Sequence, residues 1–72
     1  MRRIRKGALL GTRRADIVQE GGTFVVELFE EGHYIEKVLP KDQDRYNLTA
    51  RRIMATEIAD AWVTGEYNFL QE

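Results

Sequence analysis

Two turn signals and the apolar run between them decide the fold. Residues 21–38 read GGTFVVELFEEGHYIEKV, so Gly21-Gly22 and Glu31-Gly32 enclose a run rich in β-branched and aromatic residues. Such residues suit a pleated, half-buried sheet, and glycine suits the tight turns of hairpins. The pattern predicts an antiparallel meander of three strands, over roughly residues 12–20, 23–30 and 33–39.

One helix is expected after the meander. Pro40 cannot donate to a sheet ladder, so it ends the third strand. Asn47 is suited to cap a helix over about residues 48–64, and Gly65 is suited to end it. Apolar residues recur there with helical spacing, and Trp62 is expected to be the central core residue. The predicted apolar stripe comprises Ala50, Met54, Ile58, Ala61 and Trp62.

The start of this helix stays open between two positions. A start near Leu48 places Arg51 and Arg52 close to the positive end of the helix dipole, which is unfavourable for cations. Local pairing with Asp42 and Asp44, or a bound phosphate or carboxylate, would offset that cost. A start at Asp42 would instead place the acids in the first turn and the arginines in mid-helix.

These elements predict an α+β fold, in which a three-stranded antiparallel meander packs on one C-terminal helix. The helix is required because a lone meander cannot bury enough apolar area. A chain of 72 residues is long enough for one domain only. We expect a basic N-terminal arm over residues 1–11 and a single α+β domain over residues 12–72.

The charges are divided unevenly along the chain, although the formal net charge is only −1. Residues 1–14 carry six basic side chains and no acid, whereas residues 15–72 carry five bases and all twelve acids. Such asymmetry is typical of a basic segment that contacts nucleic acid or an acidic partner. A basic arm that lies on its own acidic body explains it equally, so both alternatives stay open.

Two-residue turns also predict that three carboxylates share one row across the sheet. Asp16, Glu27 and Glu36 would then be neighbours about 5 Å apart, and like charges placed opposite each other destabilise a sheet. The register could be slipped, or Arg13, Arg14 or the arm could neutralise the row. Alternatively, the row is a site for a basic partner or a cation.

The sheet face that carries this row is the predicted interface. Valine and aromatic rows flank the carboxylates, and such a face is not expected to lie wholly in water. We therefore expect a protein partner or self-association on this face. The predicted interface comprises Asp16, Val18, Val25, Glu27, Phe29, Tyr34, Glu36 and Val38.

The residue inventory is poor in catalytic and ligand-binding chemistry. The chain has no Cys and no Ser, and its one histidine, His33, lies beside a tight turn. No second histidine completes a metal set, and no glycine-rich loop precedes the helix. We expect no enzyme activity, catalytic residue, cofactor, metal or small-molecule substrate. No stretch approaches the roughly 18 apolar residues that span a bilayer, so we expect no membrane association and a cytoplasmic location.

The order of elements resembles the arm-type DNA-binding domain of tyrosine-family phage integrases, which also has an arginine-rich start followed by strands and a helix. The resemblance rests on that order and on Arg2, Arg3 and Arg5. It implies that the exposed sheet face enters the major groove, where carboxylates would repel phosphates. The nucleic-acid contacts in this alternative are Arg2, Arg3, Arg5, Lys6, Arg13, Arg14, Arg51 and Arg52.

A second resemblance covers roughly residues 22–65. The run VVELFEEG over residues 25–32, followed by a strand and then by ADAWVTG over residues 59–65, is similar to small uncharacterised phage and prophage proteins built from a hairpin and a helix. The resemblance implies a phage or prophage setting and no particular activity. Many small acidic phage proteins bind and block host machinery, so an accessory or inhibitor protein is one expectation.

Overall fold

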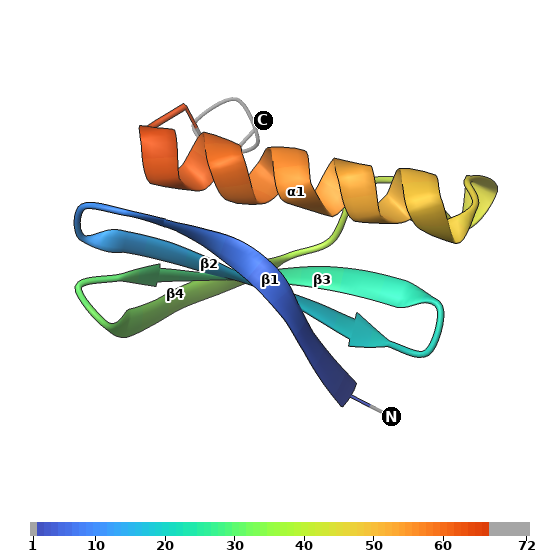
Figure 1. The fold of residues 1–72 in the computed structure, drawn as a ribbon, viewed down its shortest axis with the longest axis horizontal. Helices are drawn as coiled ribbons and strands as arrows, with labels where there is room; N and C mark the ends of the chain where they lie inside the picture. Colours follow the sequence, from blue (N-terminus) through green and yellow to red (C-terminus); the bar gives the residue numbers. More distant parts are fainter. Residues whose placement is uncertain (1, 67–72) are drawn as a thin grey trace.

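The computed structural model describes residues 2–66, and residues 1 and 67–72 lie outside this described part. The α+β class is confirmed, with an antiparallel sheet and one C-terminal helix, but the sheet has four strands in the order β1-β2-β3-β4 instead of the predicted three (Figure 1). The elements are β1 (Arg2–Leu10), β2 (Arg13–Glu20), β3 (Thr23–Glu30), β4 (His33–Val38), a 3-10 turn η1 (Gln43–Arg45) and α1 (Leu48–Thr64).

The additional strand is β1, which lies in the segment expected to form a basic arm. It pairs antiparallel with β2 through a turn that contains Gly11 with a φ of 61°. The register shifts within β1, so that Lys6 and Gly7 together lie opposite Asp16. This bulge requires glycine, because a Cβ on Gly7 would lie 1.9 Å from the carbonyl oxygen of Ala15. The bulge interrupts the alternation of side chains that would otherwise mark a strand.

A second register shift changes the predicted pairing of β4. The three-carboxylate row is wrong, because Glu27 pairs with Lys37, and Glu36 pairs with Leu28 instead. The register shifts between Leu28 and Phe29, so Ile35 is an extra residue in β4. Beyond this bulge, each β4 side chain lies on the opposite face of the sheet from the one that an unbroken hairpin predicts.

The core lies between α1 and one face of the sheet, and it includes Trp62 as expected. Ile58 and Trp62 are buried, whereas Ala50 and Met54 of the predicted stripe are only half-buried. Small residues of α1 let the helix approach the sheet closely. The core cluster comprises Ala15, Ile17, Phe24, Val26, Leu28, Ala55, Ile58, Ala59 and Trp62.

The helix begins at Leu48, and the earlier start at Asp42 is wrong. The side chain of Asn47 caps it, since its Oδ1 accepts a hydrogen bond from the amide of Ala50 at 2.8 Å. Asp42 adopts a left-handed conformation before the separate turn η1. Arg51 compensates for its place near the helix start by donating to backbone carbonyl oxygens of Gly22 at 2.6 Å, Tyr46 at 2.7 Å and Asp44 at 3.4 Å.

Candidate functional site

The sheet face opposite α1 carries a row of side chains that crosses all four strands. Leu9 pairs with Arg14, Arg14 with Phe29, and Phe29 with Tyr34; we name these four residues the aromatic row. The Arg14 guanidinium carbon lies 4.0 Å from the centre of the Phe29 ring. The rings of Phe29 and Tyr34 meet edge to face, with centroids 5.8 Å apart and an interplanar angle of 74°. Both contacts are favourable, and they link the Arg14, Phe29 and Tyr34 side chains to one another.

The aromatic row is also accessible to solvent. Leu9 is 73% exposed and Tyr34 is 56% exposed. Phe29 is half-buried under Arg14, and Arg14 itself is exposed. Large aromatic rings and arginine therefore lie together on a surface that the helix does not cover.

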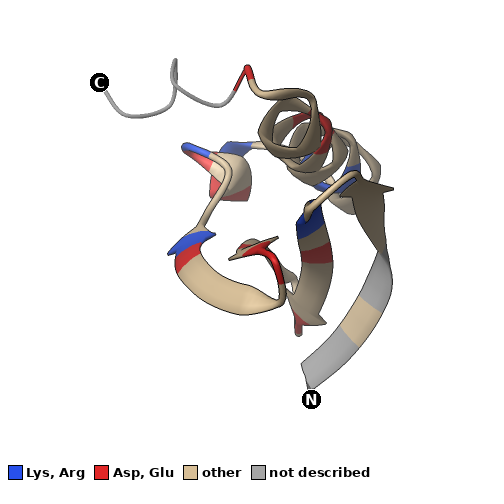
Figure 2. Cartoon of the chain, turned by 90° about the vertical axis from the view of Figure 1, so that its left-hand side faces the viewer, with Lys and Arg blue, Asp and Glu red and all other residues tan. Residues whose placement is uncertain are grey.

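A second row, next to the first, mixes both signs of charge. Asp16 pairs with Glu27, which pairs with Lys37, and we name these three residues the charged row. The Nε of Arg14 lies 3.2 Å from Oδ1 of Asp16. Asp16 therefore has Arg14 nearby, and Glu27 has Lys37 as its neighbour in the row. This agrees with the expectation that bases of the same chain neutralise the carboxylates. Basic and acidic residues lie close to each other over much of the described ribbon (Figure 2).

The structure places six of the eight predicted interface residues on the face away from α1. Asp16, Glu27, Phe29 and Tyr34 are not buried there, whereas Val18 and Val25 share the face by register but are buried. The other two residues lie on the helix side, since Val38 pairs with Val26 and packs against the core, and Glu36 pairs with Leu28. Arg14 was expected in one row with Phe29 and Tyr34 but was not counted as an interface residue, and Leu9 was missed because only the β1–β2 register places it there.

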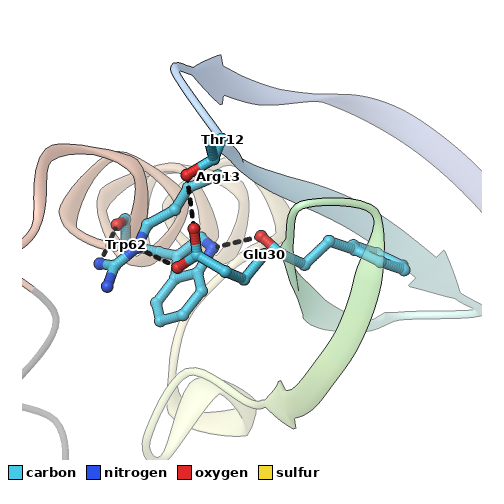
Figure 3. Close-up of polar contacts among 5 residues, drawn as sticks. Thr12, Arg13, Glu30 and Trp62 are labelled. Atoms are coloured by element: carbon cyan, nitrogen blue, oxygen red, sulfur yellow. Dashed lines mark hydrogen bonds and ion pairs between the residues drawn. The ribbon is translucent and has the colours of Figure 1, made fainter.

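Arg13, predicted as a nucleic-acid contact, instead ties the sheet to the helix end (Figure 3). Its Nε lies 2.9 Å from Oε1 of Glu30, and one terminal nitrogen donates to the Trp62 carbonyl oxygen at 3.0 Å. Its guanidinium lies 4.1 Å from the Trp62 ring centre. The indole Nε1 donates to the Phe29 carbonyl oxygen at 3.0 Å. Hydrogen bonds from the Thr12 hydroxyl and then from Arg13 lower the pKa of Glu30 below its ordinary value.

The other predicted nucleic-acid residues are divided among different environments. Arg14 belongs to the aromatic row, and Arg51 donates to backbone carbonyl oxygens. Arg52 is exposed on α1. The four bases at positions 2, 3, 5 and 6 all lie in β1. Of these bases, Arg13, Arg14, Arg51 and Arg52 therefore lie in different environments.

An open groove of about 680 Å³ lies where α1 passes the bulge of β1. Within residues 2–66, no group of three His, Cys, Asp or Glu side chains could hold a metal ion. No helix in that part of the chain is long and apolar enough to cross a membrane. The residues that line the groove are Gly7, Ile17, Arg52, Ile53, Thr56, Glu57 and Asp60.

Comparison with protein-family models, with curated proteins and with solved structures finds no match for this chain.

Proposed function

We propose that this chain is a small, non-enzymatic, protein-binding domain that uses the aromatic row to contact its partner. The single observation that carries the proposal is the exposed Tyr34 ring, held edge to face on Phe29 beneath the guanidinium of Arg14. Tyrosine, phenylalanine and arginine are enriched where protein interfaces concentrate their binding energy. Rings that are already ordered lose little conformational freedom on binding, which favours affinity.

The charged row beside it would contribute selectivity. A partner that covers the aromatic row also approaches Asp16, Glu27 and Lys37, because neighbouring rows of one sheet face lie within side-chain reach. Charges at an interface rim mainly exclude wrong partners and steer association. The resemblance to small phage and prophage proteins implies a phage or prophage setting, in which the chain would be an accessory or inhibitor protein, and the genes on either side of this one would test that setting.

The test compares Tyr34→Ala with the matched variant Tyr46→Ala. Both tyrosines are about equally exposed, at 56% and 50%, but Tyr46 lies outside the aromatic row. Proteins captured from a cell extract on the parent chain are identified, and their affinities for both variants are measured. We expect Tyr34→Ala to weaken the binding of a genuine partner by about tenfold or more, since a tyrosine at a binding hot spot costs about 2 kcal/mol or more when truncated. A partner that binds both variants equally would contradict the proposal.

Nucleic-acid binding is the second candidate, and the basic sequence of β1 favours it. Against it, Asp16 and Glu27 on the free face would repel phosphates. A labelled DNA duplex mixed with the protein at low ionic strength separates the two candidates. Binding that weakens steeply with added salt would support the second candidate, and no binding at micromolar concentration would remove it.

A further inference from the structure

The sheet face opposite α1 holds a planar cation with surface left for a second ring. In Figure 1, α1 lies against one side of the sheet, and within residues 2–66 no other helix lies on the opposite side. On that free side, the Arg14 guanidinium carbon lies 4.0 Å from the Phe29 ring centre. The Arg14 side chain is still 46% exposed, and a guanidinium can stack on aromatic rings. Tyr34 in the same row supplies an aromatic ring that is 56% exposed.

The aromatic row therefore contains both members of a stacking pair, one on each side of β3. Arg14 lies on β2 and Tyr34 lies on β4, with Phe29 on the strand between them. A second copy turned by half a rotation about an axis along β3 would place its β4 opposite β2. Its Tyr34 would then lie over Arg14, and its Arg14 over Tyr34. Such a face is self-complementary, as a two-fold interface requires.

The charged row fits the same rotation. Asp16 lies on β2, Glu27 on β3 and Lys37 on β4. Rotation about an axis along the strands keeps each row at its own level, so Asp16 of one copy would face Lys37 of the other at two symmetric contacts. Only Glu27 would meet its own equivalent, close to the axis, and two like charges there are unfavourable. Two separate rows thus indicate one arrangement of two copies.

We propose that the partner of the aromatic row is a second copy of this chain, packed face to face about a two-fold axis along β3. This inference rests on the proposed function, because it names the partner of that same face. Sheets packed face to face lie roughly 10 Å apart with strands inclined at about 30°, a gap that the long side chains of both rows can bridge. The overlap involves β2, β3 and β4, and β1 lies beyond it.

Other arrangements of two copies fit these rows less well. An axis between β2 and β3 would place Asp16 of each copy opposite Glu27 of the other, so that four carboxylates would face one another. An axis across the strands, midway between the two rows, would place Glu27 against the Phe29 ring of the other copy. That axis would also separate Lys37 from Asp16. Charge complementarity therefore favours the axis along β3.

Sedimentation equilibrium of the intact chain, from about 10 μM to about 1 mM, measures the self-association. We expect monomer and dimer to coexist within that range, because an overlap of three short strands is small for a specific interface. Amide shifts that change with concentration should centre on β3 and β4. Tyr34→Ala should weaken the dimer by about tenfold or more, whereas the similarly exposed control Tyr46→Ala should not.

Exchanged charges test the contact between the two copies. Lys37→Asp alone and Asp16→Lys alone should each weaken self-association about tenfold or more, because each variant opposes like charges at both contacts. An equimolar mixture of the two variants should form a mixed dimer, since one acid and one base again meet at each contact. The control variants Lys41→Asp and Asp60→Lys change exposed charges outside the face and should each self-associate as the parent does.

The like-charge contact near the axis gives a test that strengthens the dimer. Glu27→Gln removes that repulsion with almost no change of shape, so it should tighten self-association severalfold. The amide spectrum of every variant verifies that it is folded. If Asp16→Lys does not fold, Glu27→Gln still decides the arrangement, because a dimer that it weakens or leaves unchanged would contradict the axis along β3.

The proposal is also overturned if the parent chain is monomeric at about 1 mM. Concentration-dependent shifts centred on α1, or a mixture of Lys37→Asp and Asp16→Lys that stays monomeric, would overturn it as well. A monomeric chain that captures another protein through Tyr34 would refute the second copy as partner and support the proposed function. A captured protein that binds Tyr34→Ala and the parent chain equally would refute the proposed function itself.

Discussion

The side chain of Gln43 takes the place of a neighbouring strand at one position of β3. Its Nε2 donates to the Phe24 carbonyl oxygen at 2.8 Å, and its Oε1 accepts from the Phe24 amide, also at 2.8 Å. Gln43 is only 7% exposed. Gln43→Ala would leave two buried backbone groups of Phe24 without a partner, and each such group costs about 1–3 kcal/mol. We therefore expect the free energy of unfolding to fall by about 2–6 kcal/mol. This is a large loss, because the free energy of unfolding of a domain is only about 5–15 kcal/mol.

Urea unfolding followed by the fluorescence of Trp62, the one tryptophan, measures this loss. The matched control is Gln19→Ala, because the Gln19 amide donates to the Gly21 carbonyl oxygen at 3.0 Å in an exposed contact. We expect the control to lose less than about 1 kcal/mol. If both variants lose equally little free energy of unfolding, the buried hydrogen bonds between Gln43 and Phe24 do not stabilise the fold. That result would refute the reasoning.

The variant Gln43→Glu tests the same burial argument through the pH dependence of its stability. Burial and the Phe24 carbonyl oxygen both disfavour a carboxylate at this position, so its folded-state pKa should lie above the unfolded value of about 4.3. The protonated acid can donate to the carbonyl oxygen and accept from the amide, as the native side chain does. The contribution of the introduced carboxyl group to the free energy of unfolding should be fully present below its unfolded-state pKa. It should be lost as the pH rises through its folded-state pKa. Stability that instead rises with pH would contradict the burial argument.

Three further variants test the remaining close contacts. Gly7→Ala should lose about 1–3 kcal/mol in thermal unfolding, because its Cβ would lie 1.9 Å from the backbone oxygen of Ala15; an unchanged melting temperature would contradict the bulge. Trp62→Phe should lose about 1–3 kcal/mol, since it removes the bond to the Phe29 carbonyl oxygen and part of the buried ring; a neutral result would mean that this bond contributes nothing. The lowered pKa of Glu30 predicts a stability contribution that is present above the unfolded pKa and lost as pH falls through the folded pKa, and Glu30→Gln should remove that pH dependence.

The helix and three of the four strands could be predicted because their signals are local. The predicted helix over 48–64 matches α1, since Asn47 and Gly65 have strong preferences for the two ends of a helix. The glycine turns fixed β2, β3 and β4 to within one residue. The pairing of Phe29 with Tyr34 also followed from the second turn, because both residues lie close to it.

Contacts that depend on a bulge could not be predicted in this way. The shift at Ile35 moves Glu36 away from Glu27, and nothing in the sequence of β4 marks Ile35 as the extra residue. Gly7 does mark the bulge of β1, but a lone glycine among bases is equally compatible with an arm. Without β1, Leu9 could not be placed beside Arg14, so of the aromatic row only Arg14, Phe29 and Tyr34 could be predicted.

The two bases at the end of the basic N-terminal sequence make different contacts, which the net charge of that sequence does not reveal. Arg13 and Arg14 lie on β2, where one holds Trp62 and Glu30 and the other covers Phe29 and pairs with Asp16. The four bases at positions 2, 3, 5 and 6 lie in the separate strand β1. Changes at Arg13 should therefore alter stability. The excess of acids in the rest of the chain does not explain how Arg13 and Arg14 are placed. Each of them forms one specific ion pair, Arg13 with Glu30 and Arg14 with Asp16.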